Sequence, residues 1–227
     1  MQAVCDTYLQ APQRQAQDGT HTISIDEMTG IQALERIAPT KPVAPGQIER
    51  REFEYKRHGT QCLIANLDVV TGEVVSPTVQ ATRTELDFVA HVERTVATDP
   101  DAGWIIVCDQ LNIHWSESLV RYVAQQCQLP DDLGKKGKHG VLHSKATRKA
   151  FLEDQSHRIR FVYTPRHTSW LNQIEIWFSI LMRRVLRRGS FRSTQELRNR
   201  LLAFIDYFNR TLAKPFKWTY TGRPLNL

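Results

Sequence analysis

The stretch that decides the fold reads WIIVCD at residues 104–109, five apolar residues followed by Asp109. A continuous apolar run of this length predicts a β-strand covered on both faces, because a strand with one solvent-exposed face would alternate polar and apolar residues. Such strands are typical of sheets that have helices on both sides. The run therefore predicts an inner strand with an aspartate at its C-terminal end.

Outward from this strand, the hydrophobic pattern predicts an alternation of strands and helices, and hence an α/β fold. Short β-branched or apolar runs between turn residues favour strands, whereas apolar residues at helical spacing favour helices. The predicted strands are residues 21–25, 62–70, 73–79 and 159–163, and the predicted helices are residues 84–98, 119–127, 145–155, 170–188 and 194–208. Residues 129–143 are rich in Gly, Lys and Asp and predict an exposed loop.

Acidic residues stand beside three of these elements. Asp26 follows the first predicted strand, with its neighbour Glu27 as an alternative. Asp109 follows the apolar strand, and Glu175 lies at the margin of the apolar face of the helix at 170–188. Carboxylates are preferred ligands of Mg²⁺, and two such ions roughly 4 Å apart activate a nucleophile and stabilise a leaving oxygen. The ordered pattern predicts a nuclease-like metal site, although each acid alone also fits a turn, a cap or a solvated helix residue.

Charge is divided unevenly along the chain. Residues 1–134 hold 10 Lys or Arg and 19 Asp or Glu, a net charge of −9, whereas residues 135–227 hold 20 Lys or Arg and 5 Asp or Glu, a net charge of +15. Clustered cations bind polyanions because neutralised phosphates release their counterions. The C-terminal part therefore predicts a nucleic-acid-binding surface, with a solvated basic face as the alternative.

Composition excludes several classes of protein. With 41% hydrophobic and 24% charged residues, the 227-residue chain resembles an ordinary globular protein, and it has no apolar run of the roughly 18 residues typical of a membrane span. Residues 1–20 are polar and carry no stretch typical of a secretory signal. We expect a cytoplasmic protein with neither a membrane partner nor a small-molecule substrate.

The cysteines are scattered and contain no C-x-x-C pair. They are Cys5, Cys62, Cys108 and Cys127. This pattern favours free, buried cysteines over disulfides. A zinc site at Cys127 is a weaker alternative, because the spacing to the nearby histidines fits no standard zinc finger. Those histidines are His139, His143 and His157.

Five segments of the sequence carry a resemblance to a known family. They read SIDEMTGIQALER (24–36), FEYKRHGT (53–60), IVCDQLNIH (106–114), YTPRHTSWLNQIEIWFSIL (163–181) and KPFKWTYTG (214–222). These segments resemble bacterial transposases of the insertion-sequence 630 family, within the mariner superfamily. The segment around Glu175 is the most specific, since its Pro, Ser-Trp-Leu-Asn and Ile-Glu occur together at the spacing of the family. The similarity extends from near the start of the chain to residue 222.

The resemblance implies a ribonuclease-H-like fold, with a central mixed β-sheet flanked by helices and an insertion before the last catalytic helix. It implies that Asp26, Asp109 and Glu175 form a DDE triad, which is both catalytic and a ligand set for Mg²⁺ or Mn²⁺, with two ions expected. The implied reaction is hydrolysis of DNA at transposon ends and attack of the freed 3′-hydroxyl on target DNA. A homodimer on DNA, at the bacterial nucleoid, is expected because two ends must be joined.

Two features depart from the family pattern. Between Asp109 and Glu175 lie 65 residues, more than the usual spacing, and the surplus falls at about 129–157. This insertion would contact DNA or a second subunit, or else be a tolerated surface loop. We expect residues 1–20 to be a polar lead-in and residues 21–227 to be the catalytic domain. The usual N-terminal helix-turn-helix region has no room before Asp26, so we expect DNA binding with little sequence specificity.

Basic, aromatic and amide residues near these motifs are candidate DNA contacts. They are Lys56, Arg57, His58, Arg166, His167, Trp170, Asn172, Arg183, Arg184, Arg187 and Arg188. Cations such as these bind phosphate oxygens. As alternatives, Trp170 would cap the core, Asn172 would cap a turn, and the arginines would form a solvated helix face. For His114 we favour a structural hydrogen bond over a role at the phosphate.

Two other functions compete with a transposase. A structure-specific nuclease or resolvase on the same fold would use the same metals without joining strands. A catalytically silent DNA-binding fragment would regulate a full-length transposase and would not need to assemble the metal site.

Overall fold

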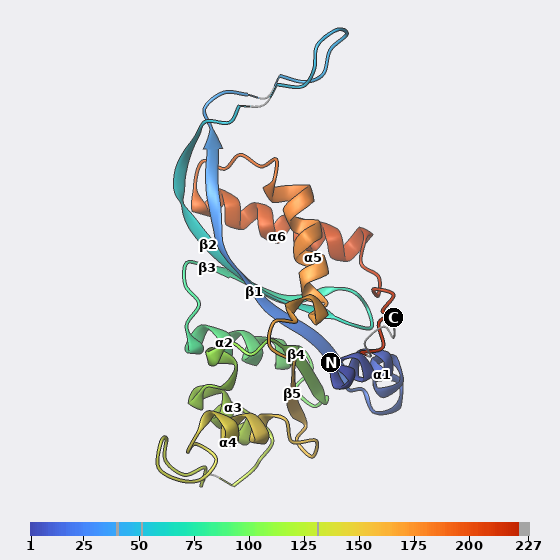
Figure 1. The fold of residues 1–227 in the computed structure, drawn as a ribbon, viewed down its shortest axis with the longest axis vertical. Coiled ribbons are helices and arrows are strands. Elements are labelled where there is room, and N and C mark those ends of the chain that lie inside the picture. The colour runs from blue at the N-terminus through green and yellow to red at the C-terminus, as the bar shows by residue number, and fades with distance from the viewer. Residues whose placement is uncertain (40, 51, 131, 223–227) are drawn as a thin grey trace.

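The chain forms a five-stranded sheet in a computed structural model that describes residues 1–39, 41–50, 52–130 and 132–222 (Figure 1). The strands lie in the order β3-β2-β1-β4-β5. Their bounds are β1 His21–Arg36, β2 Tyr55–Asp68, β3 Val74–Gln80, β4 Trp104–Cys108 and β5 Ile159–Tyr163. All five strands were predicted, but β1 and β2 are longer than their hydrophobic runs.

The sheet is mixed, because antiparallel and parallel pairing meet at β1. β1 pairs antiparallel with β2, and β2 pairs antiparallel with β3. β1 pairs parallel with β4 only as far as Ser24, and β4 pairs parallel with β5. Beyond Ser24, β2 continues to pair with β1 through backbone hydrogen bonds as far as Arg36. Asp26 therefore lies inside a strand, and the prediction that this strand ends at Ile25 is wrong.

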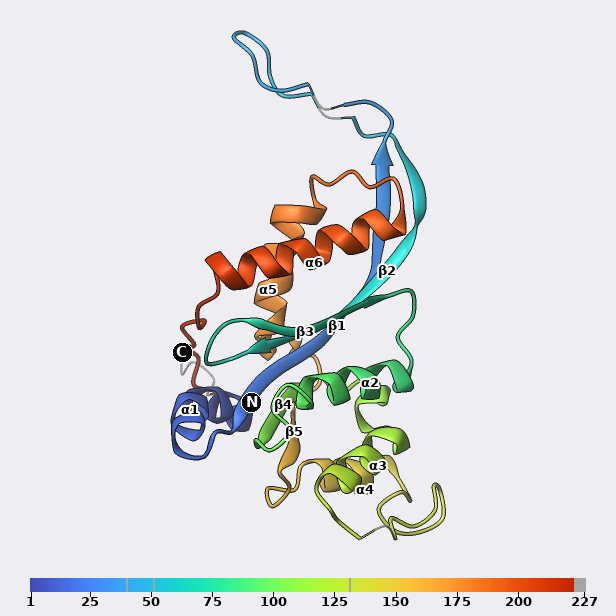
Figure 2. The same ribbon diagram turned by 180° about the vertical axis from the view of Figure 1, so that it is seen from behind.

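Helices cover both faces of the sheet. Their bounds are α1 Gln2–Asp18, α2 Glu85–Val96, α3 Glu117–Gln126, α4 Lys145–Leu152, α5 Ile174–Leu181 and α6 Thr194–Thr211. On one face, α2, α3 and α4 form a core with residues such as Ile23 and Ile106. On the other face, α5 and α6 form a core with residues such as Ala65 and Leu67 (Figure 2). Within the described ranges, no helix is long and apolar enough to cross a membrane.

Residues 2–18, expected as a polar lead-in, form helix α1. Val4, Tyr8 and Ala11 recur at helical spacing and are buried in a third core cluster together with Val107 of β4. Because Val107 and its neighbour Ile106 point to opposite faces, α1 covers the face of β4 opposite to α2 and α3. This helix was not predicted because its apolar stripe is short and most of its other residues are polar.

The helix predicted over residues 170–188 is divided into three parts. Ser169–Leu171 form a 3-10 turn, α5 spans Ile174–Leu181, and Met182–Leu186 continue as a π-helix. Asn172 has an extended backbone, with ψ of 110°, and its side chain bonds to β1. The prediction of one continuous helix is therefore wrong. The hydrogen bond from Asn172 to the sheet interrupts the helix, and hydrophobic periodicity gives no information about such a bond.

The paired ends of β1 and β2 and the loop between them, residues 34–58, extend beyond the helices (Figure 1). We call the described residues of this segment the arm. The described residues of its distal loop carry large apolar side chains that are exposed. These are Ile37, Val43, Ile48 and Phe53. The arm adds nothing to the core, and it holds an unusual concentration of exposed apolar side chains for a free surface.

The predicted insertion at 129–157 is anchored to the body of the molecule. Leu133 and Leu142 are buried in the same core cluster as α2 and α3. Arg148 of α4 is also buried and donates from Nε to the carbonyl of Trp115 at 2.8 Å and from Nη1 to that of Leu142 at 3.1 Å. Residues 135–140 are exposed and irregular, as predicted for a surface loop, but the segment on either side of them is packed into the fold.

Candidate active site

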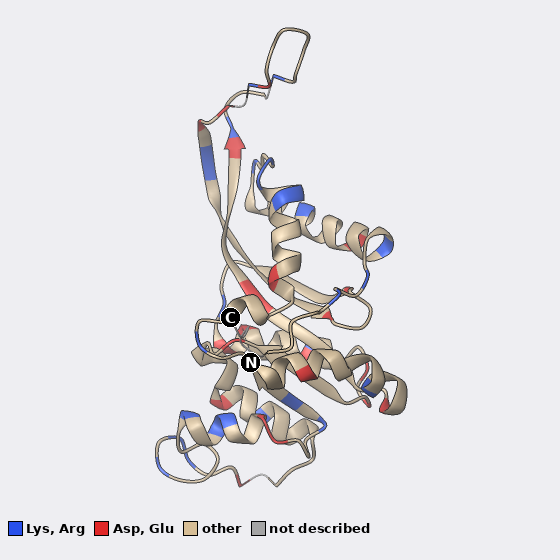
Figure 3. Ribbon diagram, turned by 45° about the vertical axis from the view of Figure 1, so that its right-hand side comes forward, with Lys and Arg blue, Asp and Glu red and all other residues tan. Residues whose placement is uncertain are grey.

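Asp26, Asp109 and Glu175 come together where the parallel part of the sheet ends. Asp26 lies in β1 two residues beyond its last pair with β4, and Asp109 directly follows β4. Glu175 is in the first turn of α5, which packs on β1. Figure 3 shows acidic segments of β1 and α5 next to each other in the middle of the molecule. The sheet and one helix thus bring together acids that are far apart in the sequence.

The pKa values show that these acids share one electrostatic environment. Burial raises the pKa of Asp26 to about 7, and the negative charges of Asp109, Glu27 and Glu175 add to the shift. Burial and the charge of Asp109 also raise the pKa of Glu175. Like charges at short range disfavour ionisation. The hydrogen-bond donors and cations around these acids therefore do not balance the negative charge of the three carboxylates.

Asp109 differs from its two partners. Burial alone would raise its pKa, but the hydrogen bond from His114 and the backbone N–H of Leu111 hold the pKa below its ordinary value. Both donors bind Oδ1, with Nδ1 of His114 at 2.8 Å and the N–H of Leu111 at 2.9 Å. Oδ2 accepts no hydrogen bond from the described residues, so it is free to bind a ligand.

Glu27 is the second partner of His114. Its Oε1 lies 3.1 Å from Nε2 of His114, and the side chains of Glu27 and His114 are 1% and 0% exposed. Burial would lower the pKa of His114, yet hydrogen bonds with Asp109, Cys108 and Glu27 raise it well above its ordinary value. Glu27 thus belongs to a buried charged network behind Asp109 and is no substitute for Asp26. The structural hydrogen bond favoured for His114 is confirmed.

Asn172 connects the acids of β1 and α5. Its Nδ2 donates to the carbonyl of Ile25 at 2.8 Å and to Oδ2 of Asp26 at 3.2 Å, while its Oδ1 accepts from the hydroxyl of Ser24. Asn172 is fully buried, so its prediction as a DNA contact is wrong. It positions Asp26 instead, and its carbonyl accepts from the N–H of Glu175 at 3.1 Å. The hydrogen bond from Ser24 that holds Asn172 could not be predicted from the sequence.

The donors present fit a hard divalent cation. Carboxylate oxygens are the ligands that such cations prefer. Oδ2 of Asp109 and the carboxylate of Glu175 accept no hydrogen bonds within the described part of the chain, and added positive charge would favour the ionised form of Asp26. No group of three or more His, Cys, Asp or Glu side chains among the described residues is close enough to hold one ion.

Residues 21–198, which include all three acids, match the family described as DDE superfamily endonuclease. The chain belongs to the DDE endonuclease superfamily. The resemblance seen in the sequence is thereby confirmed at the level of the superfamily. No curated protein matches the chain.

Solved structures with the same fold come from Mos1. The DDE chain is similar to a Mos1 mariner paired end complex with Mn, with a TM-score of 0.52, 11% identity, and coverage of 91% of this chain and 54% of that chain. A pre-cleavage Mos1 transpososome gives a TM-score of 0.50, 10% identity, and coverage of 91% and 55%. These likenesses confirm the ribonuclease-H-like fold and nothing finer. The chain spans about half the length of these solved chains.

Three predicted DNA contacts of the DDE chain lie on the arm. Lys56 and Arg57 are exposed in β2, and Nε2 of His58 lies 2.8 Å from Oε2 of Glu35. Asp26 pairs with Ala65 of β2, nine residues after Lys56, which places Lys56 roughly 30 Å along the strand from that acid. These residues are therefore well separated from the acids.

The other predicted contacts lie closer to the acids. Arg166 and His167 are exposed in the loop between β5 and α5. Trp170 is 53% exposed, and its ring meets that of Tyr220 edge to face at 5.2 Å, so the alternative that Trp170 caps the core is wrong. Arg183 and Arg184 are exposed in the π-helical continuation of α5, and Arg187 and Arg188 are exposed directly after it.

Positive charge is spread over more than one surface. Figure 3 shows Lys and Arg on the arm, around the end of α5 and α6, and again near α4. Because α4 and α6 cover opposite faces of the sheet, the basic C-terminal part does not form one continuous face. The sequence predicted its charge but not this division.

The cysteines behave as predicted in three of four positions. Cys5, Cys62 and Cys108 are free and buried, whereas Cys127 is free and partly exposed. His157, one of the histidines of the alternative zinc site, packs against Phe151 with ring centroids 4.6 Å apart. The described residues give no support to a zinc site at Cys127.

Proposed function

We propose that the chain is the catalytic part of a bacterial transposase of the insertion-sequence 630 family. Its reaction is metal-dependent hydrolysis of DNA at transposon ends, followed by transfer of the freed 3′-hydroxyl into target DNA. The observation that carries this proposal is the gathering of Asp26, Asp109 and Glu175 at one sheet edge of a DDE-family fold. The raised pKa values of Asp26 and Glu175 support it, because perturbed acids cluster at functional sites.

In this proposal the three acids hold Mg²⁺ or Mn²⁺, with two ions expected. Such ions, when bound, lower the pKa of an attacking water or hydroxyl and neutralise charge on the leaving oxygen. Asp109 offers Oδ2, because Leu111 and His114 occupy Oδ1. Asn172 bonds to the carboxylate of Asp26 and to the N–H of Glu175, so it holds these two acids next to each other.

The proposed partner is DNA, at both ends of the element and at the target. Joining two ends requires at least two catalytic chains, so a homodimer on DNA belongs to the proposal. The Mos1 structures with this fold are described as a paired end complex and a transpososome. Light scattering on the complex with paired ends tests this part, and a strictly monomeric complex would contradict it.

The decisive experiment follows nicking and strand transfer on a labelled duplex that carries the element's ends, with Mg²⁺ or Mn²⁺. We expect joined products from the unaltered chain, and a loss of roughly 1000-fold or more in rate for Asp109→Asn and for Glu175→Gln. Asp101→Asn and Glu73→Gln remove the same charges at exposed positions outside the site and serve as matched controls.

The products distinguish the competing functions. Nicking without joining would favour a nuclease or resolvase. DNA binding without any cleavage would favour a catalytically silent fragment. Cleavage that persists in Asp109→Asn and Glu175→Gln would contradict the assignment of the triad.

A further inference from the structure

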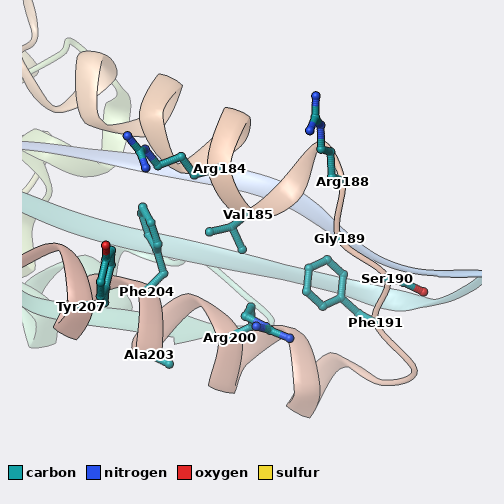
Figure 4. A pocket seen from close by; sticks show the side chains of 10 residues that line it. All are labelled: Arg184, Val185, Arg188, Gly189, Ser190, Phe191, Arg200, Ala203, Phe204 and Tyr207. Carbon is teal, nitrogen blue, oxygen red and sulfur yellow. The ribbon is translucent and has the colours of Figure 1, made fainter. Parts of the chain in front are cut away.

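A hollow of about 480 Å³ lies between the π-helical continuation of α5 and helix α6 (Figure 4). Figure 4 shows Arg184 on the first helix facing Phe204 on the second, with Arg200 and Tyr207 also on α6. Arg184 stands nine residues after Glu175, which corresponds to roughly 14 Å along a helix axis. None of the three acids lines this hollow. It is therefore distinct from the candidate active site.

The π-helical segment shapes the hollow. The N–H of Arg187 donates to the carbonyl of Met182 at 2.8 Å, a bond that spans five residues instead of the four of an α-helix. This wider turn changes the direction of the side chains after Met182, and Arg184 and Val185 line the hollow. Single π-helical turns recur at functional sites, because their less favourable geometry persists only where it is needed.

The charges around the hollow are uncompensated. The guanidinium groups of Arg184 and Arg200 form no ion pair and no hydrogen bond within the described part of the chain, and the same holds for Arg188 at the rim. No Asp or Glu is among the lining residues. Arginine binds phosphate through a planar set of donors, which makes an anionic occupant complementary to this surface.

An exposed aromatic ring, that of Tyr207, lines the same hollow as these cations. Tyr207 is 48% exposed, and its ring centroid lies 6.5 Å from that of Phe204. An aromatic face next to guanidinium groups suits a nucleotide, because the base stacks on the ring while the phosphate meets the cations. A duplex keeps its base faces covered by stacking, so only unpaired nucleotides can use such a platform.

We propose that this hollow binds unpaired nucleotides of single-stranded DNA, with phosphates at Arg184 and Arg200 and a base against Tyr207. This binding requires neither the three acids nor a divalent cation. It is therefore independent of whether the chain cleaves or joins DNA, and EDTA leaves it intact.

The test measures fluorescence anisotropy of a labelled thymidine oligonucleotide in EDTA, with a duplex of equal length in parallel. Tyr207→Ala is expected to weaken single-strand binding about tenfold, with little change for the duplex, whereas Tyr207→Phe retains binding. Arg200→Gln is expected to lower the slope of log K against log salt concentration by about 0.7, because one phosphate contact is lost. Arg198→Gln is the matched control, since Arg198 is exposed on α6 outside the hollow.

Three results would overturn the proposal. The first is unchanged single-strand binding in both Tyr207→Ala and Arg200→Gln. The second is an equal loss in Arg200→Gln and Arg198→Gln. The third is competition by polyglutamate as effective as that by the oligonucleotide, which would assign the hollow to acidic peptides. Arg200 is exposed and unpaired, so Arg200→Gln remains informative even if Tyr207→Ala disturbs folding.

Discussion

Asp26 and Glu27 are neighbours in β1, yet their carboxylates have opposite surroundings. Successive side chains of a strand point to opposite faces. Glu27 accordingly meets His114 on the side of α2 and α3, whereas Asp26 meets Asn172 on the side of α5. One acid is thus neutralised inside the protein, and the other remains uncompensated at the site. At the scale of the residue, the direction of the side chain decides its role.

The Asp26→Asn variant is expected to be more stable than the unaltered chain at pH 8. Burial and neighbouring acids raise the pKa of Asp26 from 3.8 to about 7. Between about pH 4 and 7 the folded chain holds a proton that the unfolded chain has released, so the contribution of this group is present below pH 4 and is lost as pH rises through 7. We expect a gain of about 2 kcal/mol at pH 8 and a flatter pH dependence.

Urea unfolding in EDTA at pH 4.5 and pH 8 measures this effect. Asp101→Asn is the control, since Asp101 is an exposed aspartate outside the site. If the stabilities of the unaltered chain and of Asp26→Asn depended on pH in the same way, the pKa of Asp26 would not be raised in the folded chain.

Glu27→Ala is expected to reduce the free energy of unfolding by about 3 kcal/mol, because it leaves the buried charge of His114 without one of its two partners. Glu27→Gln keeps a carbonyl that can accept from Nε2, and we expect a loss of about 1 kcal/mol. Chemical denaturation of the two variants compares them directly. Equal losses in the two variants would mean that a carbonyl oxygen at position 27 does not stabilise the charge of His114.

At the scale of elements, periodicity predicted the helices and strands but not their ends. α2, α3, α4, β4 and β5 lie close to their predicted ranges, because each is a local apolar pattern bounded by turn or capping residues. β1 exceeds its apolar run because β2 pairs with it, and α5 begins late because Asn172 bonds to β1. Both differences arise from partners that are distant in the sequence.

Helix α4 offers a test of how the insertion is attached. Arg148→Ala is expected to reduce the free energy of unfolding by about 2 kcal/mol, since two buried carbonyls lose their donor. Lys149→Ala, at the next residue, removes a partly exposed side chain that pairs with Glu153 and lies 5.5 Å from the ring centroid of Tyr163, and it is expected to cost at most about 1 kcal/mol. Thermal unfolding of both variants measures the difference, and similar losses would indicate that the insertion is not anchored through Arg148.

At the scale of the whole molecule, the acids are set apart from much of the basic surface. The acids gather in the middle, whereas Lys and Arg lie on the arm, around α5 and α6, and near α4 (Figure 3). If DNA binds at the acids, as proposed, cations at a distance from them contribute to holding it. Long-range electrostatic attraction is then expected to dominate its binding.

The affinity of the chain for duplex DNA is expected to fall steeply with salt. If about four phosphates are neutralised, log K should decrease with log salt concentration with a slope of about −3.6. Anisotropy titrations at several salt concentrations measure this slope. A flat response would contradict binding through the basic surfaces.

The sequence by itself determined the alternation of strands and helices, the position of Asp109 directly after a strand and that of Glu175 on a helix, because these are local patterns. The tertiary structure alone decided which of Asp26 and Glu27 faces the site, that Asn172 is buried, that residues 2–18 pack on the sheet, and that the basic part divides between two faces. These properties depend on contacts between residues far apart in the chain. Local periodicity carries no information about such contacts, since it records the preference of a residue for burial but not the partner it meets.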